Sequence, residues 1–367
     1  MRTKRLTTLV VLFARTVLSL TVTLLTVVDA LGAQGKPGVR QFRTDSFFIR
    51  EWIRGGVKEP DLLVEPREIA VTQSAVVVLD AGTREIHVLD LRDGSKRLVL
   101  KATGEGPGEF KRPIHIATTT QLIGVLDQAT SRITVFSDSG RYLWTTSVPD
   151  GPSVEAICML PRGRLRVKYL GAVGALATID SLGRILSRSS LPAAPELQKA
   201  PTFANAAYVA DGCADGVMSI VPIFGAFWYS IAENGATKRF AYVEAGRDAV
   251  ITLKKRAVDR SRTVKADQLI QTTEVNAIAR GAMQRGDTII VEAGATNRLP
   301  YELIDYYRAS DGKYLYSRHL PFTPSALAIT PDGRLIATFI GDETSSIVQL
   351  STTPLSPREI AKQKPRK

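Results

Sequence analysis

Two stretches of the sequence decide the fold: residues 76–100, VVVLDAGTREIHVLDLRDGSKRLVL, and residues 123–146, IGVLDQATSRITVFSDSGRYLWTT. Val78-Leu79-Asp80 in the first matches Val125-Leu126-Asp127 in the second, 47 positions later. Each stretch has an apolar run, an Asp-led turn, an alternating run, a glycine turn and another alternating run. Alternation with a period of two is typical of half-buried β-strands, and Asp and Gly suit the turns between them. The pair predicts a repeated antiparallel sheet.

Four more diverged copies follow, so that six copies extend from about Arg67 to Leu350. The third and sixth share a Pro-x-Gly-Arg-Leu turn, at residues 161–165 and 331–335. Without an insertion of roughly 30 residues, each copy is about 42 residues long, which is the length of one propeller blade. The repeat therefore predicts an all-β fold: a six-bladed β-propeller of four-stranded antiparallel blades, built as one domain over residues 67–350.

The sixth copy lacks one strand, because a tail rich in Pro and Lys (residues 351–367) follows Leu350. Residues 46–53, SFFIREWI, precede the first copy and are strongly β-forming. We expect this part of the N-terminal segment 34–66 to add the outer strand of the sixth blade and to close the ring, which removes an open sheet edge. The alternative is a flexible linker before the propeller.

Residues 1–33 have the order of a secretory signal peptide. Arg2, Lys4, Arg5 and Arg15 precede an uncharged, mostly apolar run, residues 16–28, and small residues follow it. The alternative is a retained membrane anchor, but the apolar run is shorter than the ~20 residues that a span requires. The sequence therefore predicts a secreted or periplasmic protein with no stable membrane span after cleavage.

The formal net charge of +12 is unevenly distributed. Residues 1–33 carry +3, residues 246–265 carry +5 and residues 357–367 carry +4, so these three segments account for the whole net charge. A nucleic-acid-binding surface would place basic residues across the fold itself. The neutral remainder argues against nucleic acid as a partner.

The sequence around the first two copies resembles secreted β-propellers of the NHL-repeat type. The resemblance rests on Glu59-Pro60-Asp61-Leu62-Leu63, on residues 104–110 (GEGPGEF) and on Arg132-Ile133-Thr134-Val135-Phe136, and it covers roughly residues 61–148. It implies a six-bladed propeller. It says little about function, since six-bladed propellers include lactonases, lyases, receptors and scaffolds.

Polar residues at the starts of the inner strands are the first candidates for a ligand site, because inner strands line the central channel of a propeller. A ring of such groups could bind a small ligand in a funnel, or it could hydrogen-bond across the bases of the blades and hold water in the channel. The candidates are Arg67, Glu68, His115, Glu155, Asn276 and Ser325.

Metal chemistry has weaker support in the sequence. A calcium-dependent lactonase would need oxygen ligands around the channel, to which Glu155, Asn276 and Glu68 could contribute. Asp80 and Asp127 open turns between strands, where Asp caps the turn. A zinc site needs several imidazoles, but His87, His115 and His319 occupy three different kinds of position.

The sequence contains two cysteines, Cys158 and Cys213. Cys158 lies on the inner strand expected for the third blade, where a buried, inert thiol is one interpretation. Cys213 lies in a turn expected in the adjacent fourth blade. In an oxidising compartment the two could form a disulfide, and the sequence leaves this alternative open beside two separate thiols.

The insertion at about residues 246–271 is the main departure from a regular propeller. It contains the basic run Lys254-Lys255-Arg256, and residues 259–270 could form a helix. A solvated loop is one interpretation, and a contact with an acidic partner or membrane headgroups is the other.

Together these patterns favour a non-catalytic binding or interaction protein that presents a central funnel to an unknown protein or small ligand and needs no cofactor. The alternative is a calcium-dependent hydrolase of the lactonase or esterase type, with Ca²⁺ at the channel mouth. No Gly-x-Ser-x-Gly motif marks a nucleophilic serine.

Overall fold

The computed structural model describes a large part of the chain between Arg40 and Ser351. The predicted signal peptide lies outside the described residues, and so does the predicted basic tail apart from Ser351, which ends the last strand. The described ranges are 40–43, 49–101, 104–149, 154–169, 175–192, 208–209, 213–214, 216–222, 227–243, 251–255, 271–275, 279–293, 303–341 and 343–351.

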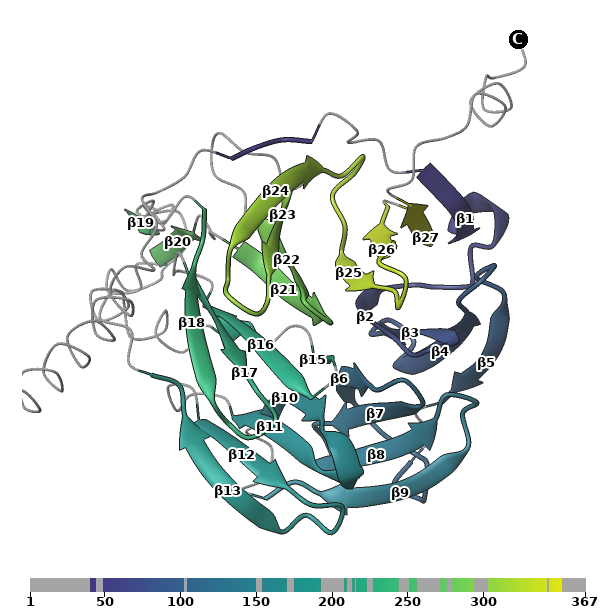
Figure 1. Ribbon diagram of the computed structural model, residues 1–367. Helices are drawn as coiled ribbons and strands as arrows, with labels where there is room; N and C mark the ends of the chain where they lie inside the picture. Colours follow the sequence, from purple (N-terminus) through teal and green to yellow (C-terminus); the bar gives the residue numbers. More distant parts are fainter. Residues whose placement is uncertain are drawn as a thin grey trace, which may run out of the picture. The chain divides into compact units, whose positions relative to one another are not determined.

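Four of the repeats fold into four-stranded antiparallel sheets with the strands in sequence order, as the alternation predicts (Figure 1). Blade one contains β2 (Pro66–Val71), β3 (Ala75–Asp80), β4 (Glu85–Asp90) and β5 (Lys96–Leu100). Blade two contains β6 (Pro113–Thr118), β7 (Leu122–Asp127), β8 (Arg132–Ser137) and β9 (Tyr142–Ser147). Blade three contains β10 (Val154–Met159), β11 (Leu165–Tyr169), β12 (Ala175–Ile179) and β13 (Ile185–Ser190). Blade five contains β21 (Ala279–Arg285), β22 (Thr288–Ala293), β23 (Leu303–Arg308) and β24 (Tyr314–His319).

Blade four differs at its inner edge. Two short strands, β14 (Tyr208–Val209) and β15 (Cys213–Ala214), both pair with β16 (Val217–Pro222) and together take the place of one inner strand. The blade continues outward through β17 (Phe227–Ile231) and β18 (Thr237–Ala241). Strand β15 also packs against β10, β6 and β21, which places it at the centre of the ring.

The N-terminal strand closes the ring, and this confirms the prediction. Blade six contains β25 (Ala326–Ile329), β26 (Leu335–Ile340) and β27 (Ser345–Ser351), and β1 (Ile49–Gly55) pairs antiparallel with β27 as the fourth strand. The last blade therefore joins chain segments almost 300 residues apart in sequence, and a six-bladed ring of mostly four-stranded sheets results.

The chain just before β1 contacts blade five. Phe42 forms a β-bridge with Ser317 of β24. The guanidinium of Arg40 donates to both carboxylate oxygens of Asp305 at 2.9–3.2 Å, and both side chains are buried. The N-terminal segment thus contacts the fifth blade as well as completing the sixth.

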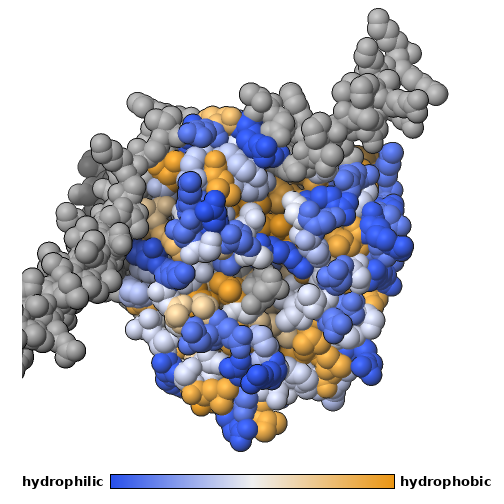
Figure 2. Space-filling view, viewed as in Figure 1, coloured by the Kyte–Doolittle hydropathy of each residue, from blue (hydrophilic) through white to orange (hydrophobic). Residues whose placement is uncertain are grey.

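The core lies between neighbouring blades. Strand β3 is buried along its whole length, because adjacent blades cover both of its faces. One cluster joins Ile116 and Val125 of blade two to Val77 and Val88 of blade one. On the ring face shown in Figure 2, hydrophilic side chains are spread widely, with smaller apolar patches between them.

The basic insertion contains a β-hairpin stem where the sequence suggested a loop or a helix. Strand β19 (Ile251–Lys255) pairs with β20 (Gln271–Val275), and Lys254 lies opposite Thr272. The β-branched residues of ITLKK and QTTEV favour extended pairing. Lys254 and Lys255 therefore lie on a strand, whereas Arg256 and the helix expected at 259–270 fall outside the described residues.

The described helical segments are single 3₁₀ turns, Gly56–Lys58 and Pro161–Gly163. Across the described part of the chain, no helix has both the length and the apolar character that a membrane crossing requires.

Candidate functional site

A polar cavity of about 170 Å³ lies between the inner strands of blades one, two, five and six. Its wall also includes Glu292 of β22 and Cys213 of β15. The structure brings four of the sequence-selected residues to this cavity: Arg67, Glu68, His115 and Ser325.

Glu68 projects from the start of β2 toward blade two. The backbone N–H of Ile116 donates to its Oε2 at 2.9 Å. Burial raises the pKa of this carboxyl group to about 8, and the Ile116 N–H opposes the shift only in part. At neutral pH, Glu68 is therefore mainly a neutral carboxylic acid that faces the cavity.

His115 has the corresponding position in blade two, and Ser325 has a similar role at the ring closure. The N–H of Ile157 donates to His115 Nδ1 at 3.5 Å, which links blade two to blade three. The Ser325 hydroxyl donates to the Pro66 carbonyl at 3.2 Å, which links blade six to blade one. These contacts are the hydrogen bonds across blade bases that the sequence suggested as an alternative role, and they also fix the cavity wall.

A β-bulge near the start of an inner strand determines which polar residue has an opposite residue on the next strand. In β2 the register shifts between Pro66 and Glu68, which leaves Arg67 as the unpaired residue. Arg67 donates to the Glu65 carboxylate and is largely exposed. In β10 the same shift leaves Glu155 unpaired.

Glu155 is absent from the residues that line the cavity, contrary to the sequence-based expectation. Its carboxylate contacts the ammonium of Lys168 on β11, which is buried. The bulge turns this side chain away from the path that Glu68 follows. Asn276, the candidate from blade five, lies outside the described residues.

Three polar cavity residues of blade five were missed by the sequence reasoning: Gln284, Arg285 and Glu292. Gln284 and Arg285 end β21, whereas the candidates predicted from the sequence all lie near strand starts. The guanidinium of Arg285 donates to the Val71 carbonyl of blade one at 3.2 Å. The sequence did contain a signal for the end of this inner strand: the turn Gly286-Asp287, which connects the first two strands of the blade.

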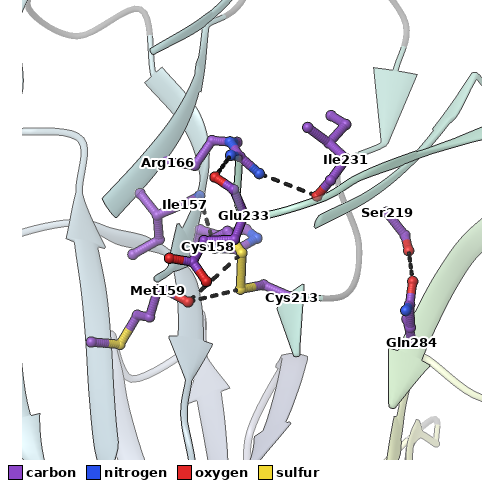
Figure 3. Close-up of a disulfide and its surroundings, with 10 residues drawn as sticks. Ile157, Cys158, Met159, Arg166, Cys213, Ser219, Ile231, Glu233 and Gln284 are labelled. Atoms are coloured by element: carbon purple, nitrogen blue, oxygen red, sulfur yellow. Dashed lines mark hydrogen bonds between the residues drawn. A yellow bond between two sulfur atoms is a disulfide. The ribbon is translucent and has the colours of Figure 1, made fainter. Parts of the chain in front are cut away.

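A disulfide joins Cys158 of β10 to Cys213 of β15, beside the cavity (Figure 3). It links the inner strands of blades three and four across a sequence separation of 55 residues. Cys158 is buried, whereas Cys213 is partly exposed and lines the cavity. Of the two alternatives that the sequence left open, the structure therefore contains the disulfide.

The three histidines lie in separate environments. His87 is buried in blade one, where burial lowers its pKa and keeps the imidazole neutral. His319 stacks on Phe42 with ring centroids 4.9 Å apart. Within the described ranges, no group of three or more His, Cys, Asp and Glu side chains is arranged to hold a metal ion.

Asp80 and Asp127 hold turns, as the sequence predicts. Asp80 accepts the N–H groups of Val64, Glu65 and Gly82 at 2.6–2.9 Å. Asp127 has the same role in blade two, where it accepts the N–H groups of Lys111 and Arg112. Both carboxylates connect a blade to the chain that enters it.

The cavity offers a neutral carboxylic acid, guanidinium groups and hydroxyls on a rigid wall, a set that suits hydrogen-bonded recognition. The serine and the cysteine of the cavity wall already have partners within the protein. Ser325 bonds to the Pro66 carbonyl and to the Thr338 hydroxyl, and Cys213 is in the disulfide.

Residues 37–169 match the family model DUF5128, described as a 6-bladed beta-propeller. The ring of blades described above agrees with this description. A comparison with curated proteins finds no match.

Among solved structures, the chain is similar to a Bacteroides fragilis NCTC 9343 protein described as exported, with 11% identity, a TM-score of 0.50, and 86% of this chain and 98% of that chain covered. It is also similar to a streptogramin B lyase, with 15% identity, a TM-score of 0.44, and 77% and 78% of the two chains covered. The virginiamycin B lyase of Staphylococcus aureus is 13% identical, with a TM-score of 0.46 and 83% and 99% covered. Such likenesses concern the fold alone.

Proposed function

We propose that the protein is an exported binding propeller of the NHL-repeat type, and that its central cavity receives a small ligand or one group of a protein partner without catalysing a reaction. The observation that carries the proposal is the convergence of Arg67, Glu68, His115 and Arg285 on one polar cavity. Hydrogen bonds between blades hold this wall in place, so that binding costs little ordering of the protein.

An oxidising location is supported by two independent features. Disulfides persist in secreted and periplasmic proteins and are rare in the cytosol, and Cys158 and Cys213 form one. The residues at the N-terminus have the order of a secretory signal. We therefore infer export as the setting in which the cavity meets its ligand.

The alternative function, a calcium-dependent hydrolase, is less well supported. The ligand set suggested by the sequence included Glu155, which contacts Lys168 and does not line the cavity. Glu68 already accepts the Ile116 N–H through one carboxylate oxygen. Calcium prefers six to eight oxygen ligands.

A cavity-filling variant tests the binding proposal. Ala326 lines the cavity, whereas Ala236 is exposed in a turn of blade four, so that A326L and A236L add the same atoms inside and outside the site. A library of small polar fragments is screened by ligand-observed NMR against all three proteins. We expect fragments that bind the wild type and A236L but not A326L. Equal binding to all three proteins, or chemical conversion of a fragment, would overturn the proposal.

A further inference from the structure

A second groove, of about 330 Å³, lies at the seam where blade six meets blade one. It is formed mainly by the β2–β3 and β4–β5 turns of blade one and the β25–β26 turn of blade six, and none of the described residues lines both this groove and the central cavity. Its volume is at the lower end of the ~300–1,000 Å³ that is usual for small-molecule sites. The polar residues that line it are Gln73, Ser74, Arg92, Arg97, Asp332 and Arg334.

The wall of blade one presents two guanidinium groups that share one carboxylate. Arg92 donates to Asp90 at 3.2–3.3 Å, and Arg97 donates to it at 2.8–3.2 Å. These hydrogen bonds hold the pKa of Asp90 well below its usual range, so that the carboxylate stays ionised. Asp90 itself is buried and does not line the groove. The charge that this wall exposes to the groove is therefore positive.

Both arginines are held in place and still have donors for a ligand. The Arg97 Nη1 also donates to the Ser74 hydroxyl at 3.0 Å. Of the five N–H donors of a guanidinium, Arg92 uses two on Asp90, and Arg97 uses three on Asp90 and Ser74. Another carboxylate nearby, Asp138 of blade two, accepts the Ser74 hydroxyl at 3.1 Å and does not line the groove. Because the protein already orders these side chains, a ligand needs to order them little.

The wall of blade six has the opposite balance of charge. One guanidinium, that of Arg334, contacts two carboxylates: Asp332 at 2.6 Å, and Glu51 of β1. The side chain of Asp332 is 54% exposed, whereas that of Arg334 is 29% exposed. An ionised carboxylate has about four acceptor sites, so Asp332 can accept further hydrogen bonds beside those from Arg334 and Thr330. Asp332 is therefore the accessible acceptor of this wall.

We propose that this groove binds an amino acid as a zwitterion, with its carboxylate on Arg92 and Arg97 and its ammonium on Asp332. Guanidinium groups suit planar carboxylates, and an ammonium is a compact donor. An anion without an ammonium would meet Asp332, and a cation without a carboxylate would meet two guanidinium groups. This site is separate from the central cavity and goes beyond the function proposed for that cavity.

Probes that carry one charge or both test the ligand class. γ-Aminobutyrate has both charges, whereas butyrate and n-butylammonium have one each on a chain of the same length. Glycine and ε-aminocaproate separate the two charges by a shorter and a longer spacer, so that the series measures the spacing between the two walls. Calorimetry at low ionic strength gives the affinities. We expect the best amino acid of the series to bind about five-fold more tightly than either single-charge probe, and added salt to weaken it.

Matched variants locate the binding. R92Q removes a guanidinium from the groove, and R141Q removes one from the exposed β8–β9 turn of blade two. D332N removes the groove carboxylate. D311N is its control, because Asp311 also lies in an exposed turn and accepts hydrogen bonds from a nearby arginine and from the turn backbone.

We expect R92Q and D332N each to weaken the best amino acid about five-fold, and the two controls to stay within about two-fold of the wild type. The two groove variants should differ with the single-charge probes. D332N should bind butyrate at least as well as the wild type does, and R92Q should do the same for butylammonium. Thermal unfolding of each variant verifies that the fold is kept, and R92Q changes a side chain that is 86% exposed.

Three results would overturn the proposal: binding of a single-charge probe as tightly as the best amino acid, equal effects of the groove variants and their controls, or no binding of any probe. The cavity-filling variant A326L should bind the amino acid as the wild type does, and a loss there would assign the binding to the central cavity instead. The fragment screen tests the central cavity separately, so that either proposal can fail without the other.

Discussion

The indole ring of Trp52 lies against Gly94, across the seam where the last blade meets the first. A Cβ atom added at Gly94 would lie 2.6 Å from Cε3 of Trp52. The indole N–H donates to the Leu91 carbonyl at 3.3 Å in the same turn region. The ring-closing strand is therefore fixed to blade one as well as to its own blade. The same relationship recurs between Gly140 of blade two and Leu98 of blade one.

This contact predicts that G94A lowers the free energy of unfolding substantially. Gly94 has φ +69°, so alanine would be strained there, and its methyl group would also collide with Trp52. Gly235 has φ +86° with open space around it, so that G235A carries only the backbone strain. We expect G235A to lower the free energy of unfolding by about 1 kcal/mol, and G94A by about 2–4 kcal/mol. Urea denaturation measures both, and equal losses would contradict the role given to Trp52.

Ring closure predicts that the N-terminal segment is required for a stable fold. Deletion of residues 34–54 removes most of β1 and the Arg40–Asp305 pair, and it exposes the edge of β27. We expect aggregation and loss of cooperative thermal unfolding, measured by size-exclusion chromatography and calorimetry. Deletion of residues 34–39 alone, which retains these contacts, is the control. Equal behaviour of the two deletions would show that β1 is dispensable.

The disulfide predicts a stability difference that depends on redox conditions. A cross-link across a sequence separation of 55 residues restricts the unfolded chain, so that C158A/C213A should lower the free energy of unfolding by about 2–4 kcal/mol. A reductant should destabilise the wild type by a similar amount and leave the double variant unchanged. Thiol titration in denaturant without reductant provides an independent check, and two free thiols in the wild type would refute the pairing.

Glu68 predicts a loss of stability with rising pH. The unfolded chain ionises this group near its usual pKa of 4.5, whereas the folded protein keeps the proton up to a pKa of about 8. Its stabilising effect is therefore complete below pH 4.5 and is lost as the pH rises to about 8. The slope for this one group is at most about 1.4 kcal/mol per pH unit. Urea denaturation from pH 5 to 9 should show a shallower decline in E68Q, and parallel profiles would argue against a buried, protonated carboxyl group.

Much of the fold could be predicted from the sequence because its signals are local. The alternation around Val78 and Val125 predicted strands, and Asp80 and Asp127 predicted the turns that they hold. The apolar segment before the repeat, together with a final repeat that lacks a strand, was enough to predict ring closure.

The candidate site was predicted only in part. Glu68 and Glu155 look alike in the sequence, since each lies at the start of an inner strand. A bulge leaves Glu155 without an opposite residue in the strand register, and its carboxylate contacts Lys168. Glu68 instead follows the bulge of its own strand and lines the cavity. Arg285 was missed because it reaches the cavity from the end of a strand, where it donates to the Val71 carbonyl of blade one.

The sequence by itself determined the repeat, the strand order within the blades and the need for an N-terminal strand, because period-two alternation and turn residues act over a few positions. The tertiary structure decided which polar groups meet at the centre, that Cys213 reaches Cys158, and that Glu68 is buried enough to keep its proton. These properties depend on bulges and on neighbouring blades that are distant in the chain. Burial and the distances across the ring arise only when the blades close around a common axis.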